Sequence, residues 1–233
     1  RIPAGIPMVP DELTEAAFYG REDVAALLDE GKVPLGLDLE TVEPVTWELK
    51  KGNLLYLTDK EEQMIQFVKQ IAHSKQKVIV LAPAYNELPE MEGVTILSTK
   101  EDYVAGIKKM EENIQLRLEQ QKSQHEATIV LYNQLELMND LSMDMQSSLN
   151  YVLEKGARAG YATVAMSGSQ LNRKIDEVSK SIKLYKQAIV AMRITDQSVL
   201  NVINRPVREE PLDSQVNYYV EDGFVRKVKV LMK

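Results

Sequence analysis

The chain has 233 residues, of which 44% are hydrophobic and 27% are charged, and its formal net charge is −7 at pH 7. This length and balance are typical of one large soluble α/β domain or of two small ones. The negative charge argues against a general nucleic-acid binder, which normally presents a basic face, and the lack of cysteine excludes disulfides and thiolate metal sites.

Neither the histidines nor the first residues indicate a metal site or a targeting segment. His73 and His125 are the only histidines and have no metal-ligand spacing, so we expect no metal. No run approaches the roughly 18 apolar residues that cross a bilayer. The start, RIPAGIPMVPDEL, lacks the basic and apolar regions of a signal peptide. Because the chain begins at Arg1 rather than Met, we expect a domain of a longer protein or a processed product.

The first fifty residues predict an extended lead-in, two short helices and an antiparallel strand. The proline-rich segment Arg1–Pro10 should be extended and laid over the domain. Apolar residues in Asp11–Glu30 predict two short helices. An extended stretch begins at Val33, and the alternation of Val45–Leu49 predicts an antiparallel strand with Trp47 as its anchor.

Short apolar runs alternate with helical patterns through the middle of the chain. The runs predict strands at Leu54–Leu57, Lys77–Leu81, Gly93–Leu97, Thr128–Tyr132, Tyr161–Met166 and Ala188–Ile194. The helical patterns predict helices at Glu61–Ser74, Lys100–Glu126, Asn139–Lys155, Gly168 to about Tyr185, and Thr195 to near Asn204. Ala188–Ile194 fits either type, and we favour a strand because Thr195-Asp196-Gln197-Ser198 looks like a new helix N-cap.

The tail and the alternating order together predict the architecture. Two β-branched runs, Gln215–Val220 and Phe224–Leu231, flank Glu221-Asp222-Gly223, which is a strong hairpin signal. Alternating strands and helices predict a doubly wound, mostly parallel sheet with antiparallel additions at both ends of the chain. We expect a single domain over residues 1–233, with a lead-in at 1–50, a core at 51–204 and a closing hairpin at 205–233.

The turn after the first core strand is where an α/β chain usually binds phosphate. Here it reads Thr58-Asp59-Lys60-Glu61 and contains no glycine. Thr-x-x-Glu fits a capping box, in which Thr58 accepts from the N–H of Glu61 and Glu61 reaches back to the N–H of Thr58. The acids Asp59, Glu61 and Glu62 would also repel a polyphosphate. We therefore favour a structural cap, and a working nucleotide loop is the alternative.

Two further strand ends lack the residues of a nucleotide site. A carboxylate that holds Mg²⁺ should follow the Thr128–Leu131 run, but the chain has Tyr132-Asn133-Gln134, and a phenol and amides are poor replacements. After the Tyr161–Met166 run, Ser167-Gly168-Ser169-Gln170 could present hydroxyls at the sheet edge. We favour a turn followed by a helix cap for this stretch.

With these positions in place, the chain resembles an FtsK/SpoIIIE-type ATPase domain. More narrowly, it is similar to the C-terminal ATPase-like domain of the membrane-anchored type VII secretion ATPases (the EssC/YukB family). The resemblance rests on the lead-in RIPAGIPMVPDEL and VPLGLDLETVEPVTWEL, on NLLYLTDKEEQMIQFVKQI at the Walker A position, on ATIVLYNQLELM at the Walker B position, on KGARAGYATVAMSGSQLN, and on the tail from Ala188. It covers nearly the whole chain and implies a P-loop NTPase (RecA/FtsK-like) fold.

The departures from the family pattern imply a degenerate nucleotide site. The Walker A glycines are absent, and Lys60 is not followed by a hydroxyl residue. Tyr132, or Asn133 with a shift of one residue, replaces the Walker B acid. The degenerate site would consist of Thr58, Asp59, Lys60, Glu61, Tyr132, Asn133 and Ser167. ATP and Mg²⁺ are then not expected as cofactors.

The resemblance implies a catalytically inactive ATPase-like domain of a type VII protein secretion motor, which is not itself an enzyme. Such a domain would bind or select secreted substrates, such as helical-hairpin proteins of the WXG100 type, and would regulate the neighbouring ATPase domains. It would lie at the cytoplasmic face of the cell membrane as part of a larger membrane protein. A weak or atypical ATPase of the same motor is the first alternative, and an unrelated small-ligand binding α/β domain is the second.

The stripe on the helix predicted over Lys100–Glu126 is the expected substrate-docking surface, since peptide helices dock in grooves between helices. It consists of Ile107, Met110, Ile114 and Leu118. The alternative is that this stripe simply packs on the sheet.

Overall fold

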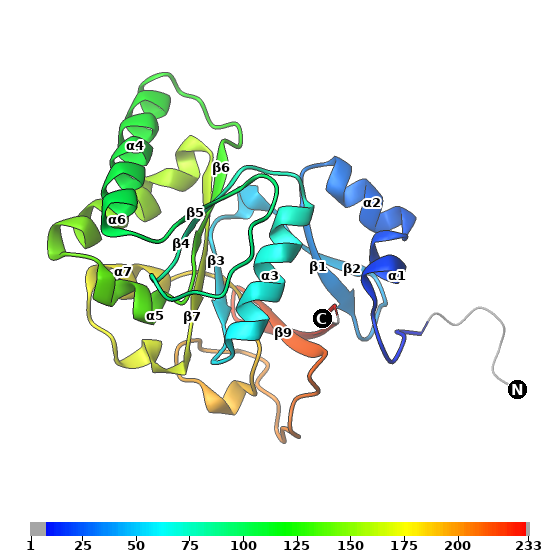
Figure 1. The fold of residues 1–233 in the computed structure, drawn as a ribbon. Coiled ribbons are helices and arrows are strands. Elements are labelled where there is room, and N and C mark those ends of the chain that lie inside the picture. Colours follow the sequence, from blue (N-terminus) through cyan, green and yellow to red (C-terminus); the bar gives the residue numbers. More distant parts are fainter. Residues whose placement is uncertain (1–7, 232–233) are drawn as a thin grey trace, which may run out of the picture.

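A computed structural model describes residues 8–231 as one ten-stranded sheet with helices on both faces (Figure 1). The strands are β1 (Val33–Asp38), β2 (Pro44–Trp47), β3 (Leu54–Leu57), β4 (Val78–Leu81), β5 (Val94–Leu97), β6 (Ala127–Leu131), β7 (Tyr161–Ser167), β8 (Gln187–Val190), β9 (Val216–Glu221) and β10 (Phe224–Lys229). Their spatial order is β2-β1-β10-β9-β8-β3-β7-β6-β4-β5. Most of the predicted extended segment Arg1–Pro10 lies outside the described residues.

The central strands pair in parallel, and the antiparallel pairs come from the two ends of the chain. β8, β3, β7, β6, β4 and β5 form the parallel part. β2, β1, β10 and β9 extend the sheet with antiparallel pairs, and β9 joins β8. The predicted α/β class, with a mostly parallel sheet and antiparallel additions, is confirmed.

Seven α-helices are described, and those from α3 onward cover the two faces of the parallel part. They are α1 (Glu15–Tyr19), α2 (Glu22–Asp29), α3 (Glu61–His73), α4 (Lys100–Glu119), α5 (Gln134–Leu137), α6 (Met143–Lys155) and α7 (Glu177–Ile182), with short 3-10 turns η1 (Leu49–Lys51), η2 (Met138–Asp140), η3 (Gly156–Ala159), η4 (Ser169–Arg173) and η5 (Ile194–Asp196). Figure 1 shows α3 on one side of the sheet and α4, α6 and α7 on the other.

Strand alternation explains the two cores. In β3, Leu55 and Leu57 belong to the core beneath α4, α6 and α7, whereas Leu54 and Tyr56 belong to the core beneath α3. Successive strand residues point to opposite faces, so a run that is apolar throughout is buried on both. Full burial of one leucine side chain contributes about 1.5–3 kcal/mol, so the sheet centre is the main source of stability.

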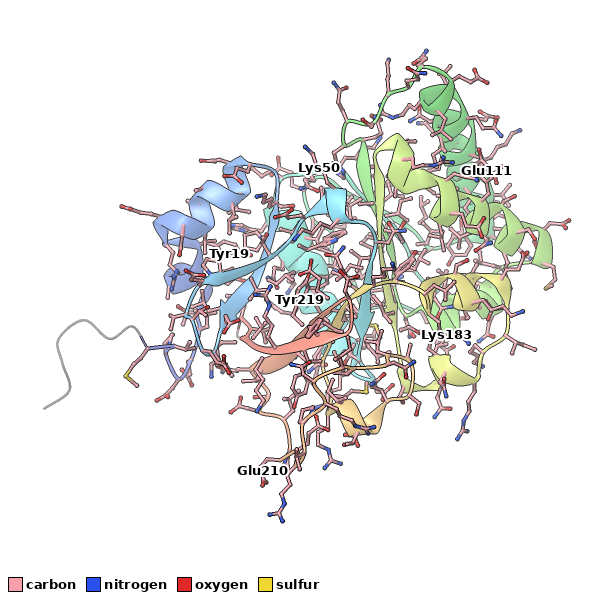
Figure 2. The ribbon with its side chains drawn as sticks, turned by 180° about the vertical axis from the view of Figure 1, so that it is seen from behind. Tyr19, Lys50, Glu111, Lys183, Glu210 and Tyr219 are labelled. Carbon is pink, nitrogen blue, oxygen red and sulfur yellow. The ribbon has the colours of Figure 1, made fainter. Side chains whose placement is uncertain are left out.

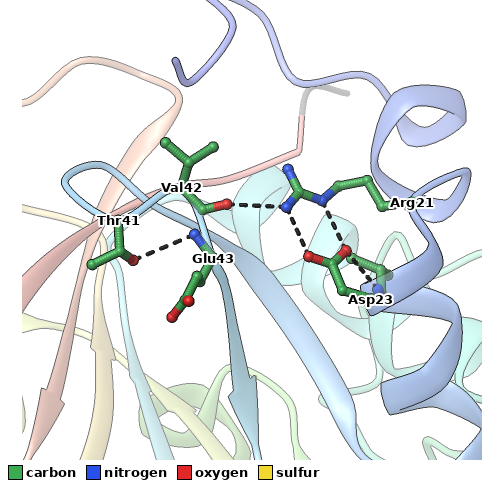
Figure 3. Close-up of polar contacts among 6 residues, drawn as sticks. Arg21, Asp23, Thr41, Val42 and Glu43 are labelled. Atoms are coloured by element: carbon green, nitrogen blue, oxygen red, sulfur yellow. Dashed lines mark hydrogen bonds and ion pairs between the residues drawn. The ribbon is translucent and has the colours of Figure 1, made fainter. Parts of the chain in front are cut away.

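The N-terminal helices attach to the antiparallel edge of the sheet. The Arg21 guanidinium donates to Asp23 at 2.8 Å and to the carbonyl oxygen of Val42 at 3.1 Å (Figure 3). This contact joins the start of α2 to the turn between β1 and β2. The two short helices predicted within Asp11–Glu30 are confirmed, as is the antiparallel strand that carries the buried Trp47.

The C-terminal hairpin is also confirmed. Asp222 and Gly223 both have positive φ, at 50° and 87°. A two-residue turn of this kind follows the twist of the two strands, and a residue without a side chain adopts the second position without strain. β9 and β10 pair along their full length, from Phe224 with Glu221 to Lys229 with Val216.

The predicted end of α4 is wrong by several residues. The helix ends at Glu119 rather than Glu126. Gln121 adopts a left-handed conformation with φ of 54°, and the N–H of Lys122 donates to the carbonyl oxygen of Arg117 at 2.8 Å. This is a Schellman motif, which usually has glycine at the left-handed position. Because glutamine occupies that position here, the sequence carried no obvious stop signal.

Two predicted helices begin later or are divided. The helix predicted over Asn139–Lys155 begins at Met143, where the Ser142 hydroxyl accepts from the N–H of Met145. The helix predicted from Gly168 to Tyr185 is divided into η4 and α7, and Asp176 caps α7. In both cases a short polar side chain at an N-cap sets the true start.

The helix predicted from Thr195 to near Asn204 does not form. Beyond η5, residues 197–215 contain no helix or strand. The Glu209 carboxylate accepts from the backbone N–H groups of Ile194 and Thr195, at 2.6 and 2.8 Å. A side chain from later in the chain thus takes donors that a local cap would have used. Figure 2 shows Glu210 at the outer end of this segment.

The strand predicted over Gly93–Leu97 forms, but not as a strand covered on both faces. β5 is an edge strand with one neighbour, β4. Its residues are half-buried except Thr95, which is exposed. Across residues 8–231, no helix is both long and apolar enough to cross a membrane.

Candidate functional site

The loop between β3 and α3 is short and hydrogen-bonded to itself. β3 ends at Leu57 and α3 begins at Glu61, which leaves three residues between them. The Thr58 hydroxyl accepts from the N–H of Lys60 at 3.1 Å and donates to Oε1 of Gln63. The N-cap of α3 is Lys60, which makes no side-chain capping bond. The predicted capping box is therefore wrong, and a Thr-centred turn takes its place.

Asp59 ties this loop to the end of β7. Its carboxylate accepts from the backbone N–H and from the hydroxyl of Ser169, both at 2.9 Å. The backbone N–H of Thr58 donates to the carbonyl oxygen of Ser167 at 2.9 Å. The ends of the two neighbouring strands are thus joined by main-chain and side-chain hydrogen bonds.

Tyr132 ties the end of β6 to the first turn of α3. Its ring is fully buried, and its hydroxyl donates to Oε1 of Glu61 at 2.7 Å. Burial raises the pKa of the Tyr132 phenol well above its usual range, and the hydrogen bond to Glu61 raises it further. The position after β6 therefore carries a neutral donor, and that donor is already bound to a carboxylate.

A buried polar chain lies behind these residues. The Ser167 hydroxyl donates to Oε1 of Gln134 at 2.9 Å, and Nε2 of Gln134 donates to the Ser179 hydroxyl at 3.0 Å. All three side chains are fully buried. Asn133 is the N-cap residue of α5 and has a left-handed conformation with φ of 47°. The sequence places Asn133, Gln134 and Ser167 at these strand ends. It does not show that Gln134 is buried or that Ser179 is its partner, because no spacing marks either.

Comparison with known protein families finds no matching family model. Among curated proteins, the type VII secretion system protein EssC of Staphylococcus aureus (strain MRSA252) is 25% identical over 239 residues, which cover 98% of this chain and 16% of EssC. The ESX secretion system protein YukB of Bacillus subtilis (strain 168) is 26% identical over 263 residues, with the same coverage. The chain is homologous to EssC and YukB. It spans about a sixth of the length of these two relatives.

Solved structures of EssC and EccC have the same fold. EssC (ATPases 2 and 3) from Geobacillus thermodenitrificans superposes with a TM-score of 0.85 at 19% identity, over 97% of this chain and 45% of that one. Thermomonospora curvata EccC (ATPases 2 and 3), in complex with a signal sequence peptide, gives 0.70 at 14% identity, over 97% and 44%. The predicted P-loop fold is confirmed.

The EssC-like fold brings together most of the residues predicted for the degenerate site. Thr58, Asp59 and Glu61 lie within one turn, next to Tyr132 and to the end of β7. Lys60 is exposed in the same turn. Asn133 and Ser167 lie behind them, with Ser167 fully buried. These residues lie at the carboxyl ends of β3, β6 and β7, and their assignment to a former nucleotide site stays a prediction.

These residues do not fit a nucleoside triphosphate with Mg²⁺. A P-loop of the form G-x-x-x-x-G-K-[ST] uses about eight residues to wrap the phosphates, whereas this loop has three. Asp59 and Glu61 are carboxylates at the position of the phosphates, and like charges repel.

The predicted docking stripe on α4 is core. Ile107, Met110 and Ile114 are at most 3% exposed, and they pack with residues of β4 and β6. Leu118 is partly buried against the same core. The alternative, that this stripe packs on the sheet, is what the structure has. A partner protein would have no access to Ile107, Met110 and Ile114 in the folded domain.

Replacing Tyr132 by Phe should lower the free energy of unfolding by about 1–2 kcal/mol, because a buried hydrogen bond to a carboxylate is lost. Urea unfolding followed by circular dichroism measures this. Glu61→Gln retains an acceptor for the phenol and should cost less than Tyr132→Phe. Equal stability of wild type and Tyr132→Phe would show that the bond contributes nothing.

Proposed function

We propose that the chain is a catalytically inactive ATPase-like domain of a type VII secretion motor. It binds or selects secreted substrates and regulates neighbouring ATPase domains of the same polypeptide. The three-residue loop between β3 and α3 is the strongest support for catalytic inactivity, because a loop this short cannot wrap the phosphates of a nucleotide. The hydrogen bonds from Ser169 to Asp59 and from Tyr132 to Glu61 support it further, since they involve the groups nearest to that position.

The comparisons support a role in protein secretion. EssC and YukB are both named as secretion system proteins. Two similar structures contain ATPases 2 and 3 in one chain, of which this domain matches a little under half, so a neighbouring ATPase domain is the first expected partner. The EccC structure holds a signal sequence peptide. We therefore propose that export signals of secreted proteins, including those of the WXG100 type, are the substrates, and that the domain lies at the cytoplasmic face of the membrane.

Titration of the domain with ATP and Mg²⁺ should give no binding and no hydrolysis. Isothermal titration calorimetry and a phosphate-release assay measure the two, with a working P-loop ATPase as a positive control. Lys60→Ala should behave as the wild type, because Lys60 has no cradle to complete. Micromolar binding that is lost in Lys60→Ala or Thr58→Ala would overturn the inactive proposal and favour a weak or atypical ATPase.

The proposed binding of secreted substrates is tested separately, with purified secreted proteins. Biolayer interferometry with WXG100-type helical-hairpin proteins and their partners should detect binding that depends on the C-terminal export signal. If no secreted substrate binds this domain in any combination, substrate selection is overturned. The domain would then retain only a role toward the neighbouring ATPases.

A further inference from the structure

The N-terminal helices α1 and α2 are held on the antiparallel edge of the sheet by a small core of their own. Phe18 of α1 and Val24 of α2 are fully buried in it. This core is separate from the two larger ones that lie beneath α3 and beneath α4, α6 and α7. Its members are Leu13, Phe18, Val24, Leu37, Val42 and Leu231. A unit with its own small core can open while the rest of the domain stays folded.

Polar and ring contacts at the surface add to this small core. The Arg21 guanidinium donates to the carbonyl oxygen of Val42 at 3.1 Å (Figure 3). Nε2 of Gln76 donates to the carbonyl oxygen of Gly31 at 2.7 Å, just beyond α2. The ring of Tyr19 stacks on His73, the last residue of α3, with the ring centroids 3.7 Å apart. Water can replace the polar contacts among these, so the attachment of α1 and α2 is reversible.

Val42, in the turn between β1 and β2, has an unfavourable backbone conformation. Its φ is 61°, and it is the only β-branched residue with a positive φ within residues 8–231. The N–H of Val42 donates to the carbonyl oxygen of Asp38, and the N–H of Asp38 donates to that of Glu43, both at 2.9 Å, which closes the hairpin loop. Glycine or asparagine usually takes the left-handed position of such a loop, because a branched Cβ clashes with the backbone there. The conformation of Val42 therefore costs free energy that other contacts must offset.

The contacts of Val42 with the N-terminal helices provide this offset. Its side chain is 8% exposed and belongs to the small core with Phe18 and Val24. Its carbonyl oxygen is bound by Arg21. Glycine would suit the backbone of the turn but would leave this packing unmade. The residue at this position thus fits the helices better than it fits the turn. Without the helices, a β-branched residue favours a negative φ.

The same turn joins β1 to β10. The N–H of Leu39 donates to the carbonyl oxygen of Lys227 at 3.1 Å. One residue earlier, Asp38 pairs with Val228 in the sheet. A change in the backbone at Val42 therefore reaches the contact between β1 and β10 through three neighbouring residues.

We propose that α1 and α2 form a latch, which sets the conformation of the β1–β2 turn. With the latch docked, Val42 is left-handed and Leu39 is bonded to β10. When the latch is released, Val42 returns to a negative φ and the bond from Leu39 to β10 is lost. Release of the helices and loosening of this edge of the sheet are then one event, so a partner that draws α1 and α2 away would also open the edge. The inference goes beyond the proposed function, because it concerns the fold alone.

NMR of the whole chain tests whether the latch sets the conformation of Val42. A positive φ brings the N–H and Hα of one residue close together, which gives a strong NOE between them. We expect a strong NOE at Val42 in the wild type and a weak one in Phe18→Asp, where a carboxylate in the small core releases the helices. Asp222, with φ of 50° in the β9–β10 turn, is the control and should keep its strong NOE. A strong NOE at Val42 with the helices released would overturn the proposal.

Hydrogen exchange shows whether the helices are released in Phe18→Asp. The N–H of Ala25, which donates to the carbonyl oxygen of Arg21 within α2, should lose its protection in this variant. Helices that stay protected would also overturn the proposal, because the small core would then not hold them. Phe18 lies outside the two larger cores, so the sheet should remain folded. If Phe18→Asp does not fold, Phe18→Ala takes its place.

Arg21→Ala tests the coupling with a milder change. It removes the bond to the carbonyl oxygen of Val42, so exchange at the N–H groups of Ala25 and Leu39 should rise together by about tenfold. The N–H of Tyr132, in the centre of the sheet, should not change. A rise at Ala25 alone, or no rise at either position, would overturn the proposal.

Arg193→Ala is the matched control for Arg21→Ala. Arg193 binds Asp196 through two hydrogen bonds, at 2.9 and 3.0 Å, much as Arg21 binds Asp23. It lies at the start of η5 and takes no part in the small core. Exchange at Ala25 and Leu39 should stay within about twofold of the wild type in this variant.

Val42→Gly separates the latch from a simple loss of packing. Glycine adopts the left-handed conformation without strain, so the turn should no longer depend on the helices. In the wild type, Phe18→Asp should raise exchange at the N–H of Leu39 by more than about tenfold. In the Val42→Gly background, the same substitution should change it by less than about twofold. Equal effects in the two backgrounds would show that Val42 does not couple the helices to the sheet edge, and would overturn the proposal.

Discussion

Replacing Ile107 by Asp should unfold the domain. Ile107 is 2% exposed and belongs to the core between α4 and the sheet, together with Tyr103, Met110 and Ile114. A carboxylate at this position would be buried without a partner, which costs more than about 4 kcal/mol. That is a large part of the roughly 5–15 kcal/mol by which a domain is stable. Thermal unfolding followed by circular dichroism should show little or no cooperative transition.

Val104→Asp is the matched control for Ile107→Asp. Val104 lies on the same helix but is 49% exposed, so a carboxylate at this position stays in contact with water. Its stability should change by no more than about 0.5 kcal/mol. If Ile107→Asp instead folded as the wild type does and lost only substrate binding, α4 would be a docking surface after all.

The order of strands and helices was predictable because it depends on local patterns. Continuous apolar runs such as Thr128–Tyr132 gave the parallel strands, and Asp222-Gly223 gave the hairpin. Helix ends were less predictable when an unusual residue took a special conformation. Gln121 takes the left-handed position after α4 that glycine usually occupies, so the residue types in this stretch did not indicate that the helix ends there.

The candidate site was predictable in position but not in its bonds. The carboxyl ends of β3, β6 and β7 meet, as expected for a parallel sheet. The bonds that fill the site join residues far apart in sequence: 110 positions separate Asp59 from Ser169, and 71 separate Glu61 from Tyr132. A local capping box would use the same side chains as these distant hydrogen bonds. Which bond forms depends on how the strands pack, and the sequence does not show this.

The proline-glycine-aspartate stretch, Pro34-Leu35-Gly36-Leu37-Asp38, carried part of the sequence resemblance, and its role here is structural. The Asp38 carboxylate accepts from the backbone N–H groups of Glu40 and Thr41, at 2.8 and 3.1 Å, and so fixes the turn to β2. Gly36 lies where β1 bulges and passes close to β10. A Cβ atom at Gly36 would lie 2.1 Å from the carbonyl oxygen of Lys229.

Gly36→Ala should therefore lower the free energy of unfolding by about 3 kcal/mol or more, because a backbone atom would have to move. Urea unfolding measures the loss, and hydrogen exchange should show reduced protection of Leu37 and Lys229, which pair in the sheet.

Thr46→Val is the control for Gly36→Ala within the same pair of strands. Thr46 pairs with Pro34, and its hydroxyl is buried without a hydrogen-bond partner in the part of the chain that the structure describes. Replacing that hydroxyl by a methyl group should leave stability unchanged or raise it. A wild-type unfolding curve for Gly36→Ala would mean that β1 can move away from β10 at no cost. The glycine would then be a point of flexibility between the lead-in and the sheet rather than a close contact.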